Sequence, residues 1–375
     1  MSLIGSLFGK ESLVGIDIGS HAIKMVQIET FRTGYRVVRA GMIRTPPGTV
    51  RDGQLTSAEA VSMAIGQLLE SSGIGANAAV VAVCGPTVAV RQIRVPKSGL
   101  PALAKSIRYE AAKHLGNNVE ESAVSYEVLG PSLEDPGQYE TMLVASPREL
   151  VESRVSAISQ AGLEPAAVDI ESFAVQRAVF ELNPDEFEDD SLRALVDIGA
   201  CHTEVTLMSG NQFVLTRSVP IAGDTFTDAI KNHFRIDVAE AEGRKHVVDM
   251  SLLLGTAIDG EAYEAAKVVQ APVDELLREI RRSIQYFQSQ ASDTGQPIHL
   301  SEILLAGGSS QMPGIADFVI ARLGIPARVV DPFLSPALFV ATPAESLVQD
   351  HGPALGLALG LALKEPMALL HGGKR

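Results

Sequence analysis

Two short turns of similar sequence place an aspartate before a glycine, one near the start of each half of the chain. The first lies in LVGIDIGSHAIKMVQI, residues 13–28, and the second in ALVDIGACHTEVTLM, residues 194–208. In both, an apolar strand runs into Asp-Ile-Gly and a small polar turn, and a second strand follows. Asp17 and Asp197 hold equivalent positions. An internal repeat of this kind predicts two related domains that face each other.

Both turns have the composition of an anion-binding backbone. Glycine at a strand turn lets backbone N–H groups point at an anion without side-chain interference, and hydroxyl groups add further donors. Two such hairpins facing across a cleft would hold a polyphosphate from both sides. The residues predicted to supply these donors are Gly19, Ser20 and His21 in the first turn, and Gly199, Ala200, Cys201, His202 and Thr203 in the second.

The paired aspartates predict a metal role. Asp17 and Asp197 would repel a phosphate directly, but each can hold a hydrated Mg²⁺ that bridges to it. Lys24, on the strand beyond the first turn, can add a positive charge. The alternative is that each carboxylate only caps its own turn. The occurrence of two matched turns favours the magnesium role.

The elements that must position these turns fall into two halves with a module between them. In the first half we predict strands at 35–43 and 79–84, and between them a helix that starts near a Thr56 and Glu59 capping box. Residues 87–162 predict a small inserted α+β module with strands at 88–95, 124–129 and 140–145 and helices at 100–115 and 149–161.

The second half predicts a strand at 213–220, helices from 224 and around 239–245, and a long amphipathic helix with Val273, Ile280 and Phe287 on one side. It then reaches a third glycine-rich turn, ILLAGGSS at residues 303–310, with a helix after Gly314. The apolar ALGLALGLALK, residues 354–364, is too short to span a bilayer and predicts a core helix whose glycines allow close packing.

Composition excludes several classes of protein. The chain has 375 residues, 46% of them hydrophobic and 20% charged, which is typical of a folded protein of two or three domains. Its net charge of −14 argues against a nucleic-acid partner. The two cysteines, Cys84 and Cys201, favour a reducing, cytoplasmic setting. The N-terminal segment Met1–Lys10 has no signal-peptide pattern.

The three glycine-bearing turns together resemble a known superfamily. Gly15–Ser20 resembles the phosphate 1 motif of the actin/hexokinase/Hsp70 superfamily, Val196–Thr203 its phosphate 2 motif, and Leu304–Ser310 its adenosine motif, in the same order. A narrower resemblance, to the PilM family of type IV pilus assembly proteins, rests on VRQIRVP at 90–96, IRYEA at 107–111, VDIESFA at 168–174 and GPALGLALG at 352–360.

The resemblance implies an α/β, actin-like (ribonuclease H-like) two-domain fold with a small FtsA-type 1C insert. Residues 1–86 and 341–375 would form domain 1, residues 87–165 the insert and residues 166–340 domain 2. It also implies ATP and Mg²⁺ as cofactors. Beyond the two turns, the implied ATP contacts are the ExxK pair Glu242 and Lys245 near the nucleoside, and Gly307, Gly308, Ser309 and Met312 near the adenosine.

The implied function is that of a cytoplasmic, ATP-binding scaffold at the inner face of the membrane, where it would serve the assembly and motor platform of a type IV pilus or a related type II secretion system. The N-terminal tail of PilN would bind at the insert, where Arg91 and Ile93 are candidate contacts, and the PilN/PilO complex would make membrane association indirect. Glu171 could orient water for slow hydrolysis, or it could be an ordinary hinge residue. Two alternatives are an FtsA-like polymerising division protein and a small-molecule kinase. A kinase needs a catalytic aspartate and a polar substrate site, and no such constellation is evident.

Overall fold

The computed structural model describes residues 13–31, 34–51, 53–115, 120–132, 134–255, 260–291 and 299–372. The segment Met1–Lys10 lies outside them, so the absence of a signal peptide there stays a prediction. In the part of the chain that is described, no helix combines the length and the apolar character needed to cross a membrane.

The first lobe is built on a six-stranded sheet in the order β10-β6-β1-β2-β3-β16. Helices α1 and α3 pack on one face, and α9 packs on the other. Because both faces are covered, the inner strand β6 is a continuous apolar run, AAVVAV, buried at every position. The elements are β1 (Leu13–Ile18), β2 (Ala22–Phe31), β3 (Gly34–Arg44), β6 (Ala78–Val83), β10 (Glu164–Ile170), β16 (Leu338–Val340), α1 (Ala58–Ser72), α3 (Arg148–Gln160) and α9 (Thr342–Gly372), with a small ribbon of β4 (Val50–Arg51) and β5 (Gln54–Leu55).

The second lobe repeats the plan with a five-stranded sheet in the order β13-β12-β11-β14-β15. Helices α5 to α8 bury their apolar sides against one face of it. The elements are β11 (Leu192–Ile198), β12 (Thr203–Ser209), β13 (Gln212–Val219), β14 (Leu300–Ala306), β15 (Ala327–Val329), α5 (Gly223–Phe234), α6 (Val238–Lys245), α7 (Glu261–Ala291) and α8 (Ile315–Leu323).

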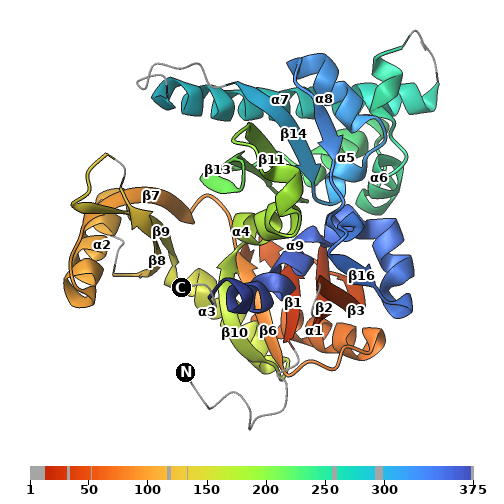
Figure 1. Cartoon of the computed structure of the whole chain (residues 1–375). Coiled ribbons are helices and arrows are strands. Elements are labelled where there is room, and N and C mark those ends of the chain that lie inside the picture. Colours follow the sequence, from red (N-terminus) through yellow and green to blue (C-terminus); the bar gives the residue numbers. More distant parts are fainter. Residues whose placement is uncertain are drawn as a thin grey trace.

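Helices α4 (Glu171–Gln176) and α9 lie between the two sheets, where a shared apolar core joins the lobes (Figure 1). Two glycines make this packing possible. A Cβ at Gly360 would lie 1.8 Å from the Ala174 carbonyl oxygen, and one at Gly15 would lie 2.1 Å from that of Ala358. The predicted core helix with glycines for close approach is therefore confirmed.

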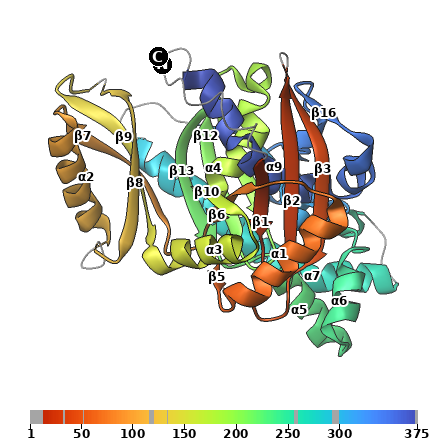
Figure 2. The same cartoon turned by 90° about the horizontal axis from the view of Figure 1, so that it is seen from below.

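The insert projects to one side of the two lobes (Figures 1 and 2). It is a three-stranded sheet, β7-β9-β8, with α2 packed on one face. Each predicted element of the module is present within about two residues of its predicted ends. The bounds are β7 (Ala89–Pro96), α2 (Leu100–Leu115), β8 (Ser122–Pro131) and β9 (Gln138–Pro147).

Three details differ from the sequence-based expectation. Helix α3 packs against α1 and buries Ala157 and Ile158 in the core of the first lobe, rather than in the insert. Strand β10 pairs with β6, so the boundary predicted after residue 165 falls inside a strand of the first sheet. The N-cap of α1 is Ser57, whose side chain accepts from the Ala60 amide, because the Thr56 hydroxyl donates to the Gly48 carbonyl instead.

Candidate functional site

A cavity of about 260 Å³ lies between the two lobes, and both Asp-Ile-Gly turns face it. It brings together segments from the whole length of the chain. Every residue predicted to contact a cofactor lines it except Thr203, and Glu171 lines it too. The predicted residues on its wall are Asp17, Gly19, Ser20, His21, Lys24, Glu171, Asp197, Gly199, Ala200, Cys201, His202, Glu242, Lys245, Gly307, Gly308, Ser309 and Met312.

The two turns have the same backbone geometry. The Gly19 amide donates to the Ala22 carbonyl at 3.2 Å, and the Gly199 amide donates to the His202 carbonyl at 3.1 Å. A Cβ on either glycine would approach that same carbonyl oxygen to 2.9 Å. Both glycines thus close their own turns, and neither amide serves a phosphate as predicted. The donors available to a phosphate come from the residues that follow each glycine.

A hydroxyl group from a separate segment fastens each turn. Thr45 donates to the Gly19 carbonyl at 2.7 Å, and Ser309 donates to the Gly199 carbonyl at 2.9 Å. Thr203 behaves differently from its prediction. Its side chain is fully buried and donates to the Ile221 carbonyl at 2.7 Å, so the hydroxyl holds β12 in place and does not face the cavity.

One observation fits an anionic ligand in this cavity, and a second explains how the third turn reaches it. The buried hydroxyl of Ser20 has no hydrogen-bond partner among the described residues, although buried hydroxyls are normally paired. Gly307 has a φ of 85°, and a Cβ there would lie 2.2 Å from an Asp197 carboxylate oxygen. The third turn can therefore pass this close to the second only because residue 307 is glycine.

Asp17 and Lys24 form an ion pair within the first hairpin. They are directly opposite in the β1–β2 register, and the ammonium lies 2.7 Å from the carboxylate. Burial opposes the charge of Lys24, but Asp17, Asp197 and Glu171 outweigh it and raise the Lys24 pKa. Lys24 is thus charged and faces the cavity, as its predicted role requires.

Asp197 lies in the same cavity, and none of the described residues forms an ion pair with it. Burial, reinforced by the nearby carboxylates of Glu171 and Asp17, raises its pKa to about 7. The residue opposite Asp197 in the β11–β12 register is Glu204, another acid. A divalent cation here would relieve the negative charge that Asp197 shares with Glu171 and Asp17.

Glu242 and Lys245 form the predicted pair on α6, 2.8 Å apart, with both side chains largely buried at the cavity. Thr227 also donates to the Glu242 carboxylate at 2.6 Å. Burial opposes ionisation of Glu242, but the hydrogen bonds from Lys245 and Thr227 lower its pKa. The pair is therefore a fixed part of the cavity wall, not an exposed surface ion pair.

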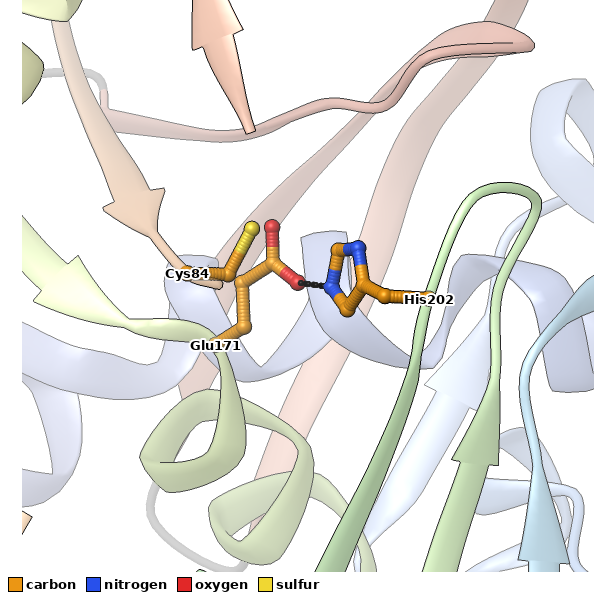
Figure 3. Close-up of side chains that lie close together, drawn as sticks. All are labelled: Cys84, Glu171 and His202. Atoms are coloured by element: carbon orange, nitrogen blue, oxygen red, sulfur yellow. Dashed lines mark hydrogen bonds and ion pairs between the residues drawn. The ribbon is translucent and has the colours of Figure 1, made fainter. Parts of the chain in front are cut away.

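Glu171 meets Cys84 and His202 at the border of the cavity, which Glu171 and His202 line (Figure 3). The His202 Nε2 lies 3.3 Å from the Glu171 carboxylate, and its Nδ1 lies 3.2 Å from the Cys201 sulfur. Burial opposes the ionised form of Glu171, but the hydrogen bond and charge of His202 outweigh it and lower the pKa. His202 was predicted to lend only its backbone, and the position of its ring was not foreseen.

A second cavity, of about 180 Å³, lies between the start of β7 and the edge strand β13. Arg91 lines it, and so does Glu171, which therefore borders both cavities. Ile93, predicted with Arg91 as a partner contact, is instead a core residue of the insert. It is 9% exposed and packs with Leu103 and Ile107 of α2.

Some residues of the first cavity were missed by sequence reasoning. The start of the apolar part of α9 contributes His351, Pro353 and Ala354, and the second lobe contributes Phe226 and His246. The GPALG stretch was recognised as a helix. Nothing in its composition indicated that its first turn would border a site made by segments far away in the sequence.

Comparison with known proteins agrees with this architecture. The family model for type IV pilus assembly protein PilM matches residues 15–366. The solved structure of a PilM-PilN type IV pilus biogenesis complex contains a chain that is 26% identical, with a TM-score of 0.81, over 94% of this chain and 98% of that one.

More distant structures share the fold alone. Ethanolamine utilization protein EutJ from Carboxydothermus hydrogenoformans is 18% identical, with a TM-score of 0.54, over 93% of this chain and 88% of that one. MreB5 of Spiroplasma citri bound to AMPPNP is 12% identical, with a TM-score of 0.52, over 98% and 99%. The α/β, actin-like fold predicted from the three turns is confirmed.

The family model spans nearly the whole chain and includes both turns, the insert and α9. It favours the pilus-assembly prediction over the division-protein and kinase alternatives. The chain belongs to the PilM family of type IV pilus assembly proteins.

Proposed function

We propose that the chain binds Mg-ATP in the cavity between its two lobes. The amides after Gly19 and Gly199 and the Ser20 hydroxyl would hold the phosphates, and Lys24 would add a positive charge. Asp17 and Asp197 would hold Mg²⁺ through its water shell. Glu242, Lys245, Gly307, Gly308, Ser309 and Met312 would surround the nucleoside.

The observation that carries this proposal is the matched geometry of the two turns on opposite walls of one cavity. A single Asp-Gly turn is common, but two with the same glycine-closed backbone, both facing the space between the lobes, suit a polyphosphate. An actin-like relative, MreB5, has been solved with AMPPNP.

A thermal melt with and without Mg-ATP tests the proposal, supported by titration with a fluorescent nucleotide. A ligand that binds only the folded state raises the melting midpoint by an amount that grows with the logarithm of its concentration relative to its Kd. We expect a clear rise. Unchanged melting together with an unchanged titration would contradict nucleotide binding.

We propose that nucleotide serves mainly as an assembly switch, with at most slow ATP hydrolysis. Glu171 borders the cavity and would be the group that orients water. Glu171→Gln should then abolish the residual ATPase activity and leave Mg-ATP binding measurable. If the variant keeps the parent's hydrolysis rate, Glu171 has no role in it.

We propose that the partner is the N-terminal cytoplasmic peptide of PilN. The scaffold would then sit at the inner face of the cytoplasmic membrane, held there indirectly by the PilN/PilO complex, with no nucleic-acid partner. The family membership and the PilM-PilN complex among its relatives support this. The second cavity lies next to the edge strand β7, where an extended peptide could add main-chain hydrogen bonds.

The second cavity suggests a pair of matched variants on one strand. Arg91→Gln changes a residue that lines the cavity. Arg94→Gln changes one whose guanidinium is already paired with Glu134 and Glu140 on the insert surface. In a pull-down with PilN peptide, with and without ATP, we expect Arg91→Gln to weaken capture and Arg94→Gln to leave it unchanged. Equal capture by both variants would place the peptide elsewhere.

A further inference from the structure

Three potential metal ligands from separate segments converge where the two lobes meet (Figure 3). The Cys84 sulfur, a Glu171 carboxylate oxygen and a His202 ring nitrogen all lie within 4.8 Å of one another. In the figure the thiol and the imidazole flank the carboxylate. Cys84 is buried and the other two side chains are largely buried.

The fold itself fixes this convergence. Strands β6 and β10 are parallel neighbours with Val83 opposite Ile170, so the next residues, Cys84 and Glu171, emerge side by side at the carboxyl edge of the first sheet. His202 comes from the opposite lobe, in the turn between β11 and β12. The ligand set therefore spans the interface between the lobes.

We propose that Cys84, Glu171 and His202 form a binding site for a divalent transition metal ion, with Zn²⁺ as the preferred ion. This site is separate from the Mg²⁺ site of the proposed nucleotide. Mg²⁺ takes oxygen ligands in octahedral geometry, whereas a thiolate, an imidazole and a carboxylate together suit Zn²⁺. Three protein ligands leave one tetrahedral position for a water molecule.

The separation of the Glu171 and His202 ligand atoms suits one shared ion. Zinc bonds to nitrogen and oxygen are about 2.0–2.2 Å long, so two such ligands of a tetrahedral ion lie roughly 3.3–3.5 Å apart. The Glu171 oxygen and His202 Nε2 are 3.3 Å apart. The other ring nitrogen, Nδ1, lies 3.2 Å from the Cys201 sulfur, a contact that holds the ring with Nε2 toward the site.

The charges balance once the ion is bound. Zn²⁺ replaces the thiol proton of Cys84 and the Nε2 proton of a charged His202, and both protons pass to solvent. The thiolate and the Glu171 carboxylate then cancel the charge of the ion. The buried guanidinium of Arg154 opposes a cation here, but it is held by the carbonyls of Ala82 and Gly53. Asp17 also lies near Glu171 but is paired with the charged Lys24, so these two offset each other, whereas the nearby Asp197 favours a cation.

A bound ion would link the two lobes between the two cavities. Glu171 borders both cavities, and His202 lines the first while Cys84 lines the second. Zinc should therefore raise the thermal midpoint of the nucleotide-free protein, because its ligands come from both lobes.

The test uses the full chain without nucleotide, stripped with a chelator and reloaded with Zn²⁺. We expect one equivalent of zinc to remain after gel filtration, and a chromophoric zinc chelator would give the affinity by competition. Reloading with Co²⁺ should produce the near-ultraviolet charge-transfer band of a cobalt thiolate. Less than stoichiometric zinc in the parent protein, or cobalt binding without a thiolate band, would overturn the proposal.

The two cysteines provide a matched pair of variants. Cys84→Ser should lower zinc affinity more than about 100-fold and remove the cobalt thiolate band, because a ligand is lost. Cys201→Ser alters only an outer contact of His202, so one equivalent of zinc and the band should remain. Glu171→Gln keeps the side-chain shape and should also lose zinc, which keeps the test decisive if Cys84→Ser folds poorly. Parent-like zinc binding in Cys84→Ser and Glu171→Gln would contradict the site.

Discussion

The two Asp-Ile-Gly hairpins have the same backbone geometry, but the residues around their buried aspartates differ in charge. In the first, the residue opposite Asp17 is Lys24, which pairs with it at 2.7 Å. In the second, the residue opposite Asp197 is Glu204, and the pKa of Asp197 rises to about 7 through burial and neighbouring carboxylates. One hairpin is therefore neutralised from within, while the other depends on a cation or a proton from outside.

Because of this difference, we expect Asp17 and Asp197 to play different roles in nucleotide binding. The first hairpin holds Lys24 in its charged form when the cavity is empty, so Lys24 can meet an incoming phosphate without taking up a proton. The second gains most when a divalent cation arrives, because the cation replaces the proton that burial otherwise imposes. The Mg²⁺ dependence of nucleotide affinity should therefore come mainly from the second hairpin.

The largest effect should come from breaking the internal pair of the first hairpin. Lys24→Met leaves the Asp17 carboxylate buried without its partner, which should lower the free energy of unfolding by about 3–5 kcal/mol. Chemical denaturation of the nucleotide-free protein measures it. The matched change in the second hairpin, Glu204→Gln, removes an acid opposite an acid and should cost far less. Comparable losses in the two variants would show that the hairpins do not differ in charge balance.

The two aspartates should also differ in their contribution to Mg²⁺-dependent nucleotide affinity. Asp197→Ala should weaken it about 100-fold and Asp17→Ala about 10-fold, which are the limits typical of an outer-sphere group. The smaller loss in Asp17→Ala follows because the freed Lys24 can then pair with a phosphate. Titration with a fluorescent nucleotide, in Mg²⁺ and in chelator, separates the two contributions. If either variant binds Mg-ATP as tightly as the parent, that aspartate only caps its turn.

The sequence could predict these hairpins because their signals are local. An apolar strand, an acid, a glycine and a second strand stand within sixteen residues, and the repeat made the two copies recognisable. The Lys24 charge was also predicted near the phosphates. The pairing of Lys24 with Asp17 depends on the strand register, which the turn sets but which the residue types alone do not state.

The Cys84, Glu171 and His202 cluster lacked any such signal. Its members are separated by the whole insert and by the crossover into the second lobe, so no fixed spacing joins them. The same reasoning explains the error over α3. Its amphipathic pattern predicted a helix correctly, but the pattern cannot say whether the apolar side packs on the insert or on α1.

The raised pKa of Asp197 predicts a stronger pH dependence than that of the first hairpin, where burial also raises the pKa of Asp17 but Lys24 opposes the rise. Its pKa is about 7 in the folded protein and about 3.9 in an unfolded chain, so the folded state holds the extra proton between these values. The stability of the parent protein should therefore fall as pH rises from about 4 to 7. Asp197→Asn cannot ionise, so it should not lose stability as the pH rises, and at pH 8 it should be more stable than the parent by about 2 kcal/mol. This is less than the whole difference between the two pKa values would give, because the protein interior relaxes around the charge.

Melting curves in metal-free buffer at several pH values measure this difference. The two proteins should converge toward pH 4, where both carry a neutral side chain at residue 197. A constant difference across the whole pH range would mean that Asp197 is ionised throughout, and the contrast between the hairpins would then be one of geometry alone.

The smallest effect concerns the two hydroxyls that fasten the turns. Thr45→Val and Ser309→Ala each remove one hydrogen bond to a turn glycine, at 2.7 Å and 2.9 Å, and each should cost about 1 kcal/mol of stability. Their effects on nucleotide should differ. Ser309 lines the cavity and links the third turn to the second. Its loss should therefore also weaken nucleotide binding by up to about tenfold, which corresponds to the free energy of one hydrogen bond. Thr45 does not line the cavity, so Thr45→Val should bind nucleotide as the parent does. The same titration measures both variants. Equal nucleotide affinities would show that the Ser309 hydrogen bond is not needed to hold the third turn against the second, and that the close approach at Gly307 is sufficient.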